Sequence, residues 1–320
     1  GGNNAGNPGG WEGGYFEPNN NPFIDDARPG EYLTDYLTRK AQEYSRVHRS
    51  EPFYLQLSYF TPHSPHQAPR EIVERYKRKK GRGGHSNPHY AAMIDVLDCN
   101  IGRLMQTLRE AGIEKNTLFI FFSDNGGVGG YDFLGHSRNN VTDLSPLKGG
   151  KTTYYEGGIR VPLIIRWPRV VEPGSQCNEP VIGTDFYPTL LAASGIQKPR
   201  NYLLDGKNLM PLLKGAPSPG GSRVLYWHFP GYPNNIWRTT PVSALRYGKW
   251  KLLKFYEEFY RSGEVELYNL QEDLGETSNV AHEHLPITRE LQNKLQIWLE
   301  KNNAPTPMER RKKSVNTNLK

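Results

Sequence analysis

The 320-residue sequence has a mass of 36.4 kDa, enough for one large domain or a main domain with a smaller companion. Its 12 % aromatic content argues against a wholly disordered chain, and its mean hydropathy of −0.71, without an apolar run near about 18 residues, excludes a membrane-spanning bundle. The net charge of +7 favours anionic partners, whereas only two cysteines, Cys99 and Cys177, exclude a disulfide scaffold or a multi-cysteine zinc module.

The first thirty residues are dense in glycine, asparagine and proline, which predicts an extended loop. Apolar and aromatic residues at spacings of three and four then predict a helix from Tyr32 to about His48. From Pro52 to Phe60 the pattern becomes that of a strand, and the turn-forming Thr-Pro-His-Ser-Pro-His follows it. This order places His63 just past the carboxyl end of a strand.

The segment 77–84 is basic and carries glycines, so we expect an exposed loop. No nucleic-acid-binding motif accompanies these charges, and we expect no nucleic-acid partner. Asn87 as N-cap and Pro88 at the first helical position begin the strongest helix signal, which ends at Gly112. The following segment, 117–122, is apolar on both faces, as in a central strand covered by helices on both sides.

Strands that alternate with helices and end in polar residues are typical of an open α/β sheet with its site at the carboxyl edge. A further strand over 159–167 continues the alternation. A helix over 185–193 follows, with Thr184 as the expected cap and Gly195 as the expected end.

The pattern changes after about residue 221. Period-two alternation over 244–255 and 265–270 predicts antiparallel strands, and 287–301 predicts an amphipathic helix. We therefore predict three parts: the C-terminal part of a large α/β domain over 1–220, a smaller α+β subdomain over 221–308, and a disordered basic tail over 309–320.

Asp124 and Asn125, followed by two glycines, offer a carboxylate and an amide oxygen side by side. Such hard oxygens suit Ca²⁺ or Mg²⁺, although an isolated Asp-Asn-Gly is more often a simple turn. Its position directly after a buried strand favours a site, because a surface turn needs no such rigid support.

Two other motifs carry side chains suited to oxyanions. Lys148 and Lys151 lie in a glycine-rich loop, where an ammonium group can meet a negatively charged oxygen. His63 follows a strand and can donate to an anion or exchange a proton near neutral pH.

Taken together, several segments resemble the motifs of the type I sulfatases, in the same order. They are P-F-Y-L-Q-L-S-Y-F-T-P-H-S-P-H-Q-A-P (52–69), Y-A-A-M-I-D-V-L-D (90–98), N-T-L-F-I-F-F-S-D-N-G-G (116–127), P-L-K-G-G-K-T-T-Y-Y-E-G-G-I-R-V-P (146–162), T-D-F-Y-P-T-L-L (184–191), L-D-G-K-N-L-M-P-L-L (204–213) and L-Y-N-L-Q-E-D-L-G-E-T-S-N-V-A (267–281). The resemblance implies an alkaline-phosphatase-like α/β fold, with a sheet sandwiched by helices and a small C-terminal subdomain of antiparallel sheet plus helix.

That family hydrolyses sulfate esters with a formylglycine made from the Cys or Ser of C/S-x-P-x-R, beside Ca²⁺, with Mg²⁺ as the alternative ion. The resemblance implies that Asp124 and Asn125 bind the metal and that Lys151 and His63 contact sulfate oxygens. His228, Trp237 and Arg238 are expected in a loop ahead of the C-terminal sheet. The resemblance implies that this region can line the substrate pocket, although ordinary aromatic packing explains the segment equally well.

The sequence departs from the family in having no C/S-x-P-x-R motif. In the family this motif lies upstream of the one that contains His63. We therefore expect that an N-terminal part with the formylglycine and the first strands of the sheet is missing, and that the chain alone is inactive. Export from the cytoplasm is expected from the resemblance only.

The expected substrate is a sulfated small molecule or a sulfated glycan. One alternative keeps the superfamily and changes the ester to a phosphate or phosphonate. Another is a non-catalytic protein that binds sulfated polyanions through the basic loop, Lys151 and His63.

Overall fold

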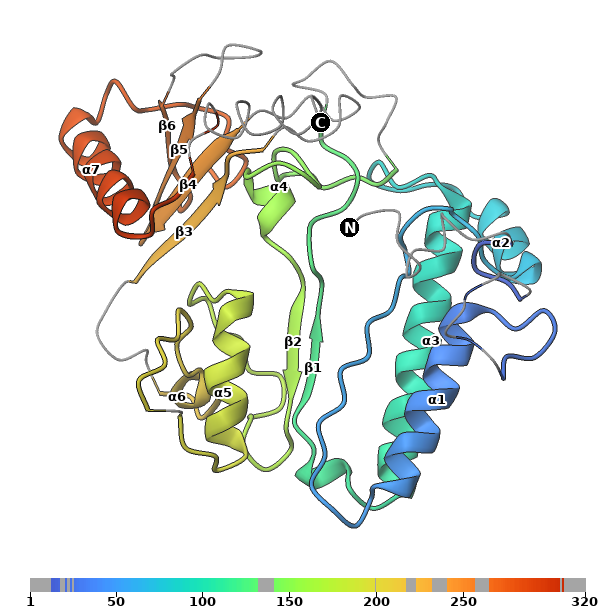
Figure 1. Ribbon diagram of the computed structural model, residues 1–320. Helices are drawn as coiled ribbons and strands as arrows, with labels where there is room; N and C mark the ends of the chain where they lie inside the picture. The colour runs from blue at the N-terminus through green and yellow to red at the C-terminus, as the bar shows by residue number, and fades with distance from the viewer. Residues whose placement is uncertain are drawn as a thin grey trace, which may run out of the picture. The chain divides into compact units, whose positions relative to one another are not determined.

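The computed structural model describes residues 13–17, 21, 24, 26–131, 141–198, 200–216, 223–231, 241–256, 265–305 and 307. The chain divides into two compact units (Figure 1), the first of Gly1–Phe119 with Ile165–Arg169, the second of Ile120–Ile164 with Val170–Lys320. No helix in these described ranges is both long enough and apolar enough to cross a membrane.

The first unit contains helices that pack on one another. α1 (Leu33–Val47) and α2 (Arg70–Lys77) both pack against α3 (Pro88–Glu110), and a 3₁₀ turn, η2 (Glu114–Asn116), follows. The helix predicted after Tyr32 is confirmed as α1. α2 ends at Lys77, and its last turn carries Arg75 and Lys77. The rest of the basic segment, 78–84, is an exposed loop, as predicted.

The start of α3 confirms the predicted cap. The Asn87 side chain accepts hydrogen bonds from the backbone N–H groups of His89 and Tyr90, both at 3.1 Å, and Pro88 occupies the first turn. Gly112 follows the helix at φ +74°, a conformation that suits glycine because it has no Cβ.

The core of this unit joins the α1–α3 pair to the N-terminal segment. Buried residues of the cluster are Tyr15, Tyr32, Leu33, Tyr36, Ala68, Val73, Ala92, Met93 and Val96. The rings of Tyr15 and Tyr32 stack with centroids 5.4 Å apart. Buried Asn100 donates to Asp35 at 2.9 Å, which ties α3 to α1 by a polar contact inside the apolar packing.

Asp26 makes the pH dependence of this unit testable. Its carboxylate accepts hydrogen bonds from Lys40 at 3.0 Å and from the Tyr36 hydroxyl at 2.9 Å, and these bonds, Lys40 first, lower its pKa to about 2. A lowered pKa means that the ionised carboxylate stabilises the fold at pH values above about 4, the ordinary pKa of Asp. This contribution disappears as the pH falls towards 2.

We therefore expect Asp26→Asn to lower the stability at pH 6 and to have no effect near pH 2. Urea unfolding midpoints of both proteins at the two pH values measure this. A difference that stays constant over the range would contradict the assignment.

The prediction of a hydrogen-bonded strand over 52–60 was wrong. The segment is extended, and the exposure of its side chains alternates from residue 53 to 59, but it forms no strand pairing within the described residues. Alternation is set locally by the pleat of an extended chain, whereas a strand also requires a neighbouring chain in register.

β1 (Phe119–Phe122) and β2 (Leu163–Arg166) form a two-stranded sheet. Hydrogen bonds beyond the strand ends, Ser123 N–H to Pro162 O and Gly126 N–H to Gly158 O, continue an antiparallel register towards the following loops. The predicted strand over 159–167 is thus shorter than expected, because Glu156–Ile159 forms a helical turn, α4. Phe122 is 39 % exposed, so β1 is not covered on both faces here.

The helix predicted over 185–193 is α5 (Phe186–Ala193), preceded by the 3₁₀ turn η5 (Gly183–Asp185) and followed by α6 (Met210–Leu213). The predicted cap was wrong, since Thr184 lies within η5 and the N-cap residue of α5 is Asp185, whose side chain makes no capping hydrogen bond. The buried Asp185 carboxylate instead accepts from the backbone N–H of Ile182, upstream of the helix, at 2.9 Å. Asp185 also pairs with Arg223 at 2.9 Å, which fixes the start of α5 in the interior. Gly195 lies after the helix at φ +71°.

The C-terminal part of the chain contains a four-stranded antiparallel sheet. Its strand order is β3 (Val224–Phe229), β4 (Val242–Tyr247), β5 (Trp250–Phe255), β6 (Val265–Asn269). α7 (Leu285–Lys301) packs on one face of it (Figure 1).

Alternation along β4 and β5 separates the two faces of this sheet. Leu245 and Leu252 lie in the cluster that contains Leu291 and Leu295 of α7. Their neighbours Ala244 and Leu253 lie instead in the cluster that contains Tyr155, just before α4. The second face of the sheet therefore packs against the segment that follows the glycine-rich loop of Lys148 and Lys151, called the lysine loop below.

Candidate functional site

Asp124 and Asn125 lie directly after β1, in the loop where the sequence predicts a metal site. Asp124 is exposed, and its Oδ1 accepts a hydrogen bond from the Asn125 side-chain amide at 3.1 Å. The Ser123 hydroxyl donates to the backbone oxygen of Asn125 at 2.9 Å, which holds the turn. The carboxylate and the amide thus lie side by side at the end of a strand.

The loop that carries Lys151 lies against this metal-site loop. The backbone N–H of Lys151 donates to the carbonyl oxygen of Gly127 at 2.8 Å, two residues after Asn125. The Tyr131 hydroxyl donates to the carbonyl oxygen of Lys151 at 2.7 Å. Three predicted site residues, Asp124, Asn125 and Lys151, are therefore carried by two loops that bond directly to each other.

Glycines allow this close approach. A Cβ added at Gly126 would overlap the carbonyl oxygen of Gly157, and one added at Gly150 would overlap the carbonyl oxygens of Gly127 and Gly129. At these positions a side chain has no room, because the two backbones lie in contact. The glycine-rich composition of 126–130 and 149–158 is thus explained by loop-to-loop packing.

We expect Gly126→Ala to destabilise the protein by about 3 kcal/mol, the upper end of the cost of overpacking, because the obstructing atom is backbone. Gly102→Ala is the matched control: this glycine is within α3 and a Cβ there meets nothing within 4 Å. It should stabilise by about 0.5–1 kcal/mol. Denaturant unfolding of both variants measures the contrast, and equal effects would contradict the packing.

The two ends of the lysine loop are held by the C-terminal sheet. The Lys148 ammonium donates to the Tyr268 hydroxyl and to the Glu276 carbonyl oxygen, each at 3.2 Å, and lies 4.3 Å from the ring centroid of Tyr155. At the other end, Glu156 pairs with Lys251 of β5 at 2.9 Å. Both contacts span about a hundred residues of sequence or more.

Lys251 is the centre of a buried charge cluster. Its side chain is 0 % exposed and also lies 2.8 Å from the carboxylate of Glu276, while the side chains of Glu156 and Glu276 are 2 % and 0 % exposed. Burial opposes ionisation of Glu156, but Lys251 outweighs it and lowers the pKa of this carboxyl. Burial dominates at Glu276 and raises its pKa.

His63 belongs to the first unit, whereas Asp124, Asn125 and Lys151 belong to the second. Its backbone N–H donates to Phe60 at 2.8 Å, and the Tyr15 hydroxyl donates to its carbonyl oxygen at 2.9 Å. The side chain is exposed, with Nδ1 2.9 Å from the carbonyl oxygen of Ser64. The turn is well held, and the contact with sulfate stays a prediction.

His228 was expected in a loop, and this was wrong, because it lies within β3. Its Nε2 lies 3.0 Å from the carbonyl oxygen of Pro305 and therefore donates, which leaves Nδ1 to accept from the Ser243 hydroxyl at 2.7 Å. Both ring nitrogens thus have protein partners, and the substrate contact stays a prediction. Trp237 and Arg238, from the same predicted region, lie outside the described residues.

Asp124 and Asn125 fit a hard divalent cation as two of its ligands, since Ca²⁺ takes roughly six to eight oxygens. In the described part of the chain, no group of three or more His, Cys, Asp or Glu side chains could hold a metal ion. This pair alone would fill only part of such a coordination shell.

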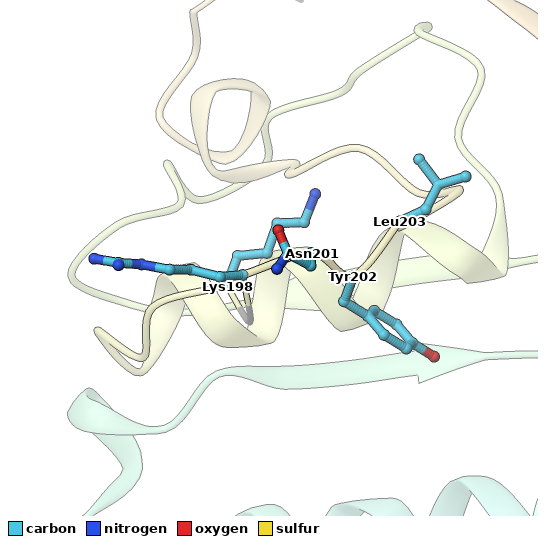
Figure 2. A pocket seen from close by; sticks show the side chains of 5 residues that line it. Lys198, Asn201, Tyr202 and Leu203 are labelled. Atoms are coloured by element: carbon cyan, nitrogen blue, oxygen red, sulfur yellow. The ribbon is translucent and has the colours of Figure 1, made fainter.

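A separate open cavity of about 520 Å³ is lined by Lys198, Arg200, Asn201, Tyr202 and Leu203 (Figure 2). None of the predicted site residues lines it. In Figure 2 the labelled side chains of Lys198 and Tyr202 point in different directions, so they do not converge on one ligand-sized point.

Comparison with known proteins places this geometry in a family. Residues 3–196 match the family model described as sulfatase, and residues 150–304 match the model described as N-sulphoglucosamine sulphohydrolase, C-terminal. The chain belongs to the sulfatase family. The first match contains Asp124, Asn125 and Lys151, and the second contains Lys151 and the C-terminal sheet.

Individual relatives agree with this sulfatase assignment. A sulfatase of Formosa agariphila is 36 % identical over 90 % of this chain and 53 % of its own length. The steryl-sulfatase of Rattus norvegicus is 29 % identical over 85 % of this chain and 46 % of its own length. The chain thus spans about half the length of these curated relatives.

The crystal structure of Ps i-CgsB in complex with k-i-k-neocarrahexaose superimposes with a TM-score of 0.73 at 28 % identity, over 86 % of this chain and 56 % of that chain. The predicted alkaline-phosphatase-like α/β fold is confirmed by this likeness.

Sequence reasoning missed the residues that hold the lysine loop. Lys148 was grouped with Lys151 as a cation for oxyanions, but it contacts two tyrosines and a carbonyl oxygen. Glu276 and Lys251 were not considered at all. The available signal was a charged residue flanked by apolar ones in a predicted strand, since Lys251 lies between Trp250 and Leu252.

Proposed function

We propose that this chain forms part of a sulfate ester hydrolase in which Lys151 binds the sulfate group beside a cation held by Asp124 and Asn125. The observation that carries the proposal is the hydrogen bond from Lys151 N–H to Gly127 O, at 2.8 Å. It joins the loop of a predicted sulfate ligand to the loop of two predicted metal ligands.

The roles follow from charge. Sulfate ester cleavage increases negative charge on oxygens around sulfur, and an ammonium group within a rigid loop stabilises that charge without having to reorganise. A bound Ca²⁺ would act as a Lewis acid on the same oxygens. Asp124 and Asn125 would orient that ion through carboxylate and amide oxygens. His63 is assigned a sulfate contact by the family resemblance.

The nucleophile is proposed to be a formylglycine in the full-length protein. The 320 residues contain no C/S-x-P-x-R sequence. Hydrolysis by this mechanism is therefore a property proposed for the full-length protein, and these residues supply the sulfate and metal contacts.

The proposed substrate is a sulfated carbohydrate. The support is the likeness to the structure solved with a neocarrahexaose, at 28 % identity and a TM-score of 0.73. Export from the cytoplasm is part of the proposal, because sulfated polysaccharides are extracellular polymers.

The experiment is a substrate panel with the full-length protein and Ca²⁺: sulfated oligosaccharides, an aryl sulfate, and the matching phosphate and phosphonate monoesters. We expect turnover of sulfate esters, strongest on the oligosaccharides, and its loss on chelation and in Asp124→Ala. Preferred phosphate or phosphonate turnover would replace the proposal by the alternative ester. Salt-sensitive binding of sulfated glycan without any turnover would replace it by a binding protein.

A further inference from the structure

The loop around Lys151 is strained where it carries the functional side chain. Thr152, the next residue, has φ +76°, in the left-handed region that residues with a branched Cβ avoid. Such a conformation persists only when the surrounding structure holds it. The contacts that hold this loop therefore determine where the Lys151 ammonium lies.

Those contacts come from one turn of the C-terminal subdomain. The Glu276 carbonyl oxygen accepts from the Lys148 ammonium, and the Glu276 carboxylate accepts from the backbone N–H of Glu156 at 2.5 Å. One residue thus bonds to both ends of the segment 148–156. A Cβ added to Gly275 would lie 2.9 Å from the carbonyl oxygen of Pro146, so the turn and the loop are in backbone contact.

Glu276 is itself held in an unfavourable state. Its φ is +51°, and its side chain is 0 % exposed. Lys251, also fully buried, supplies the compensating charge at 2.8 Å and pairs at the same time with Glu156. Removing the Lys251 charge leaves Glu276 buried without its cation, and removing the Glu276 charge takes one of two carboxylate partners from Lys251, so the ion cluster and the turn are expected to move together.

We propose that Glu276 and Lys251 are positioning residues for Lys151: the buried pair fixes the turn, and the turn fixes the loop at Lys148 and Glu156. The inference rests on the proposed function, because it assigns the C-terminal subdomain a role in sulfate binding by Lys151. A misplacement of about 1 Å at a reacting group can cost about a hundredfold in rate.

The test is a double-mutant cycle in the full-length protein. Glu276→Gln keeps the shape and removes the charge, and we expect kcat/KM for a sulfate ester to fall about ten- to a hundredfold. In the Lys151→Ala background the same change should cost less than about twofold, because the side chain that it positions is gone. A general loss of folded protein would reduce both backgrounds by the same factor.

Arg223→Met is the matched control, since it breaks a separate ion pair of this unit, between Arg223 and the buried Asp185, 2.9 Å apart. It should lower the melting temperature and leave kcat/KM within about twofold. Hydrogen exchange at the amides of 149–153 is the second measurement, and exchange should become faster in Glu276→Gln and stay unchanged in Arg223→Met.

Additive losses in the cycle, or unchanged activity in Glu276→Gln, would overturn the inference while Lys151→Ala still lowered turnover as the proposed function requires. Full activity in Lys151→Ala would instead overturn the proposed function. If Glu276→Gln does not fold, Lys148→Met carries the same cycle, since it keeps the apolar stem over Tyr155 and removes the ammonium.

Discussion

Lys151→Ala in the full-length protein should lower kcat for sulfate ester hydrolysis by about 10²–10³-fold, the loss typical of removing one preorganised oxyanion donor. The ammonium acts on charge that increases during the reaction, so the effect on kcat should exceed that on KM. Lys151→Arg should recover only part of the activity, because a planar guanidinium does not occupy the position of an ammonium group.

The matched control is Lys198→Ala, a lysine at the open cavity away from the proposed site. It should leave kcat and KM unchanged. Steady-state kinetics on the best sulfate ester of the panel measures both variants. Wild-type kcat/KM in Lys151→Ala, or equal losses in the two variants, would show that turnover does not depend on this loop.

Lys251→Met should lower the free energy of unfolding by about 3–5 kcal/mol, because Glu276 then loses its cation and Glu156 keeps only the longer contacts with Arg160 and Arg246. The matched control is Lys294→Met, which breaks an exposed pair with Glu290 at 3.5 Å on α7. That change should cost less than about 1 kcal/mol. Denaturant unfolding monitored by far-ultraviolet circular dichroism measures both.

The deficit in Lys251→Met should also depend on pH. Without the ammonium, burial raises the folded-state pKa of Glu276 further above its unfolded value, and the pKa of Glu156 is lowered less than in the wild type. The folded state then binds more protons than the unfolded state, so stability falls as the pH rises. The deficit relative to wild type should be smaller at pH 5 than at pH 8. A deficit that does not change, or one equal to that of Lys294→Met, would contradict the cluster.

Local patterns predicted the elements whose causes are local. The cap at Asn87 and the end at Gly112 depend on residues within one turn, and α3 has the predicted start. The extended conformation of 53–60 was predicted in the same way. Its missing pairing was not, because a strand partner is chosen by the rest of the chain and leaves no mark on the segment itself.

The same distinction between local and distant causes applies to the candidate site. Asp124, Asn125 and Lys151 are found from short motifs, and their loops do bond to each other. The role of Lys148 could not be found in this way, since Tyr268 lies 120 residues further along the chain. Two residues separate Lys148 from Lys151 in one glycine-rich loop, and only distant contacts distinguish the structural lysine from the proposed functional one.

The extended segment 53–60 has a consequence for handling the protein. Its sequence, F-Y-L-Q-L-S-Y-F, contains no charge, proline or glycine, and Tyr54 is 65 % exposed. Such segments with an open edge pair between molecules and can stack into intermolecular β-structure. Self-association of the 320-residue chain should therefore begin here and increase with concentration, and a lysine in place of Tyr54 would act as a gatekeeper against it on the exposed face alone.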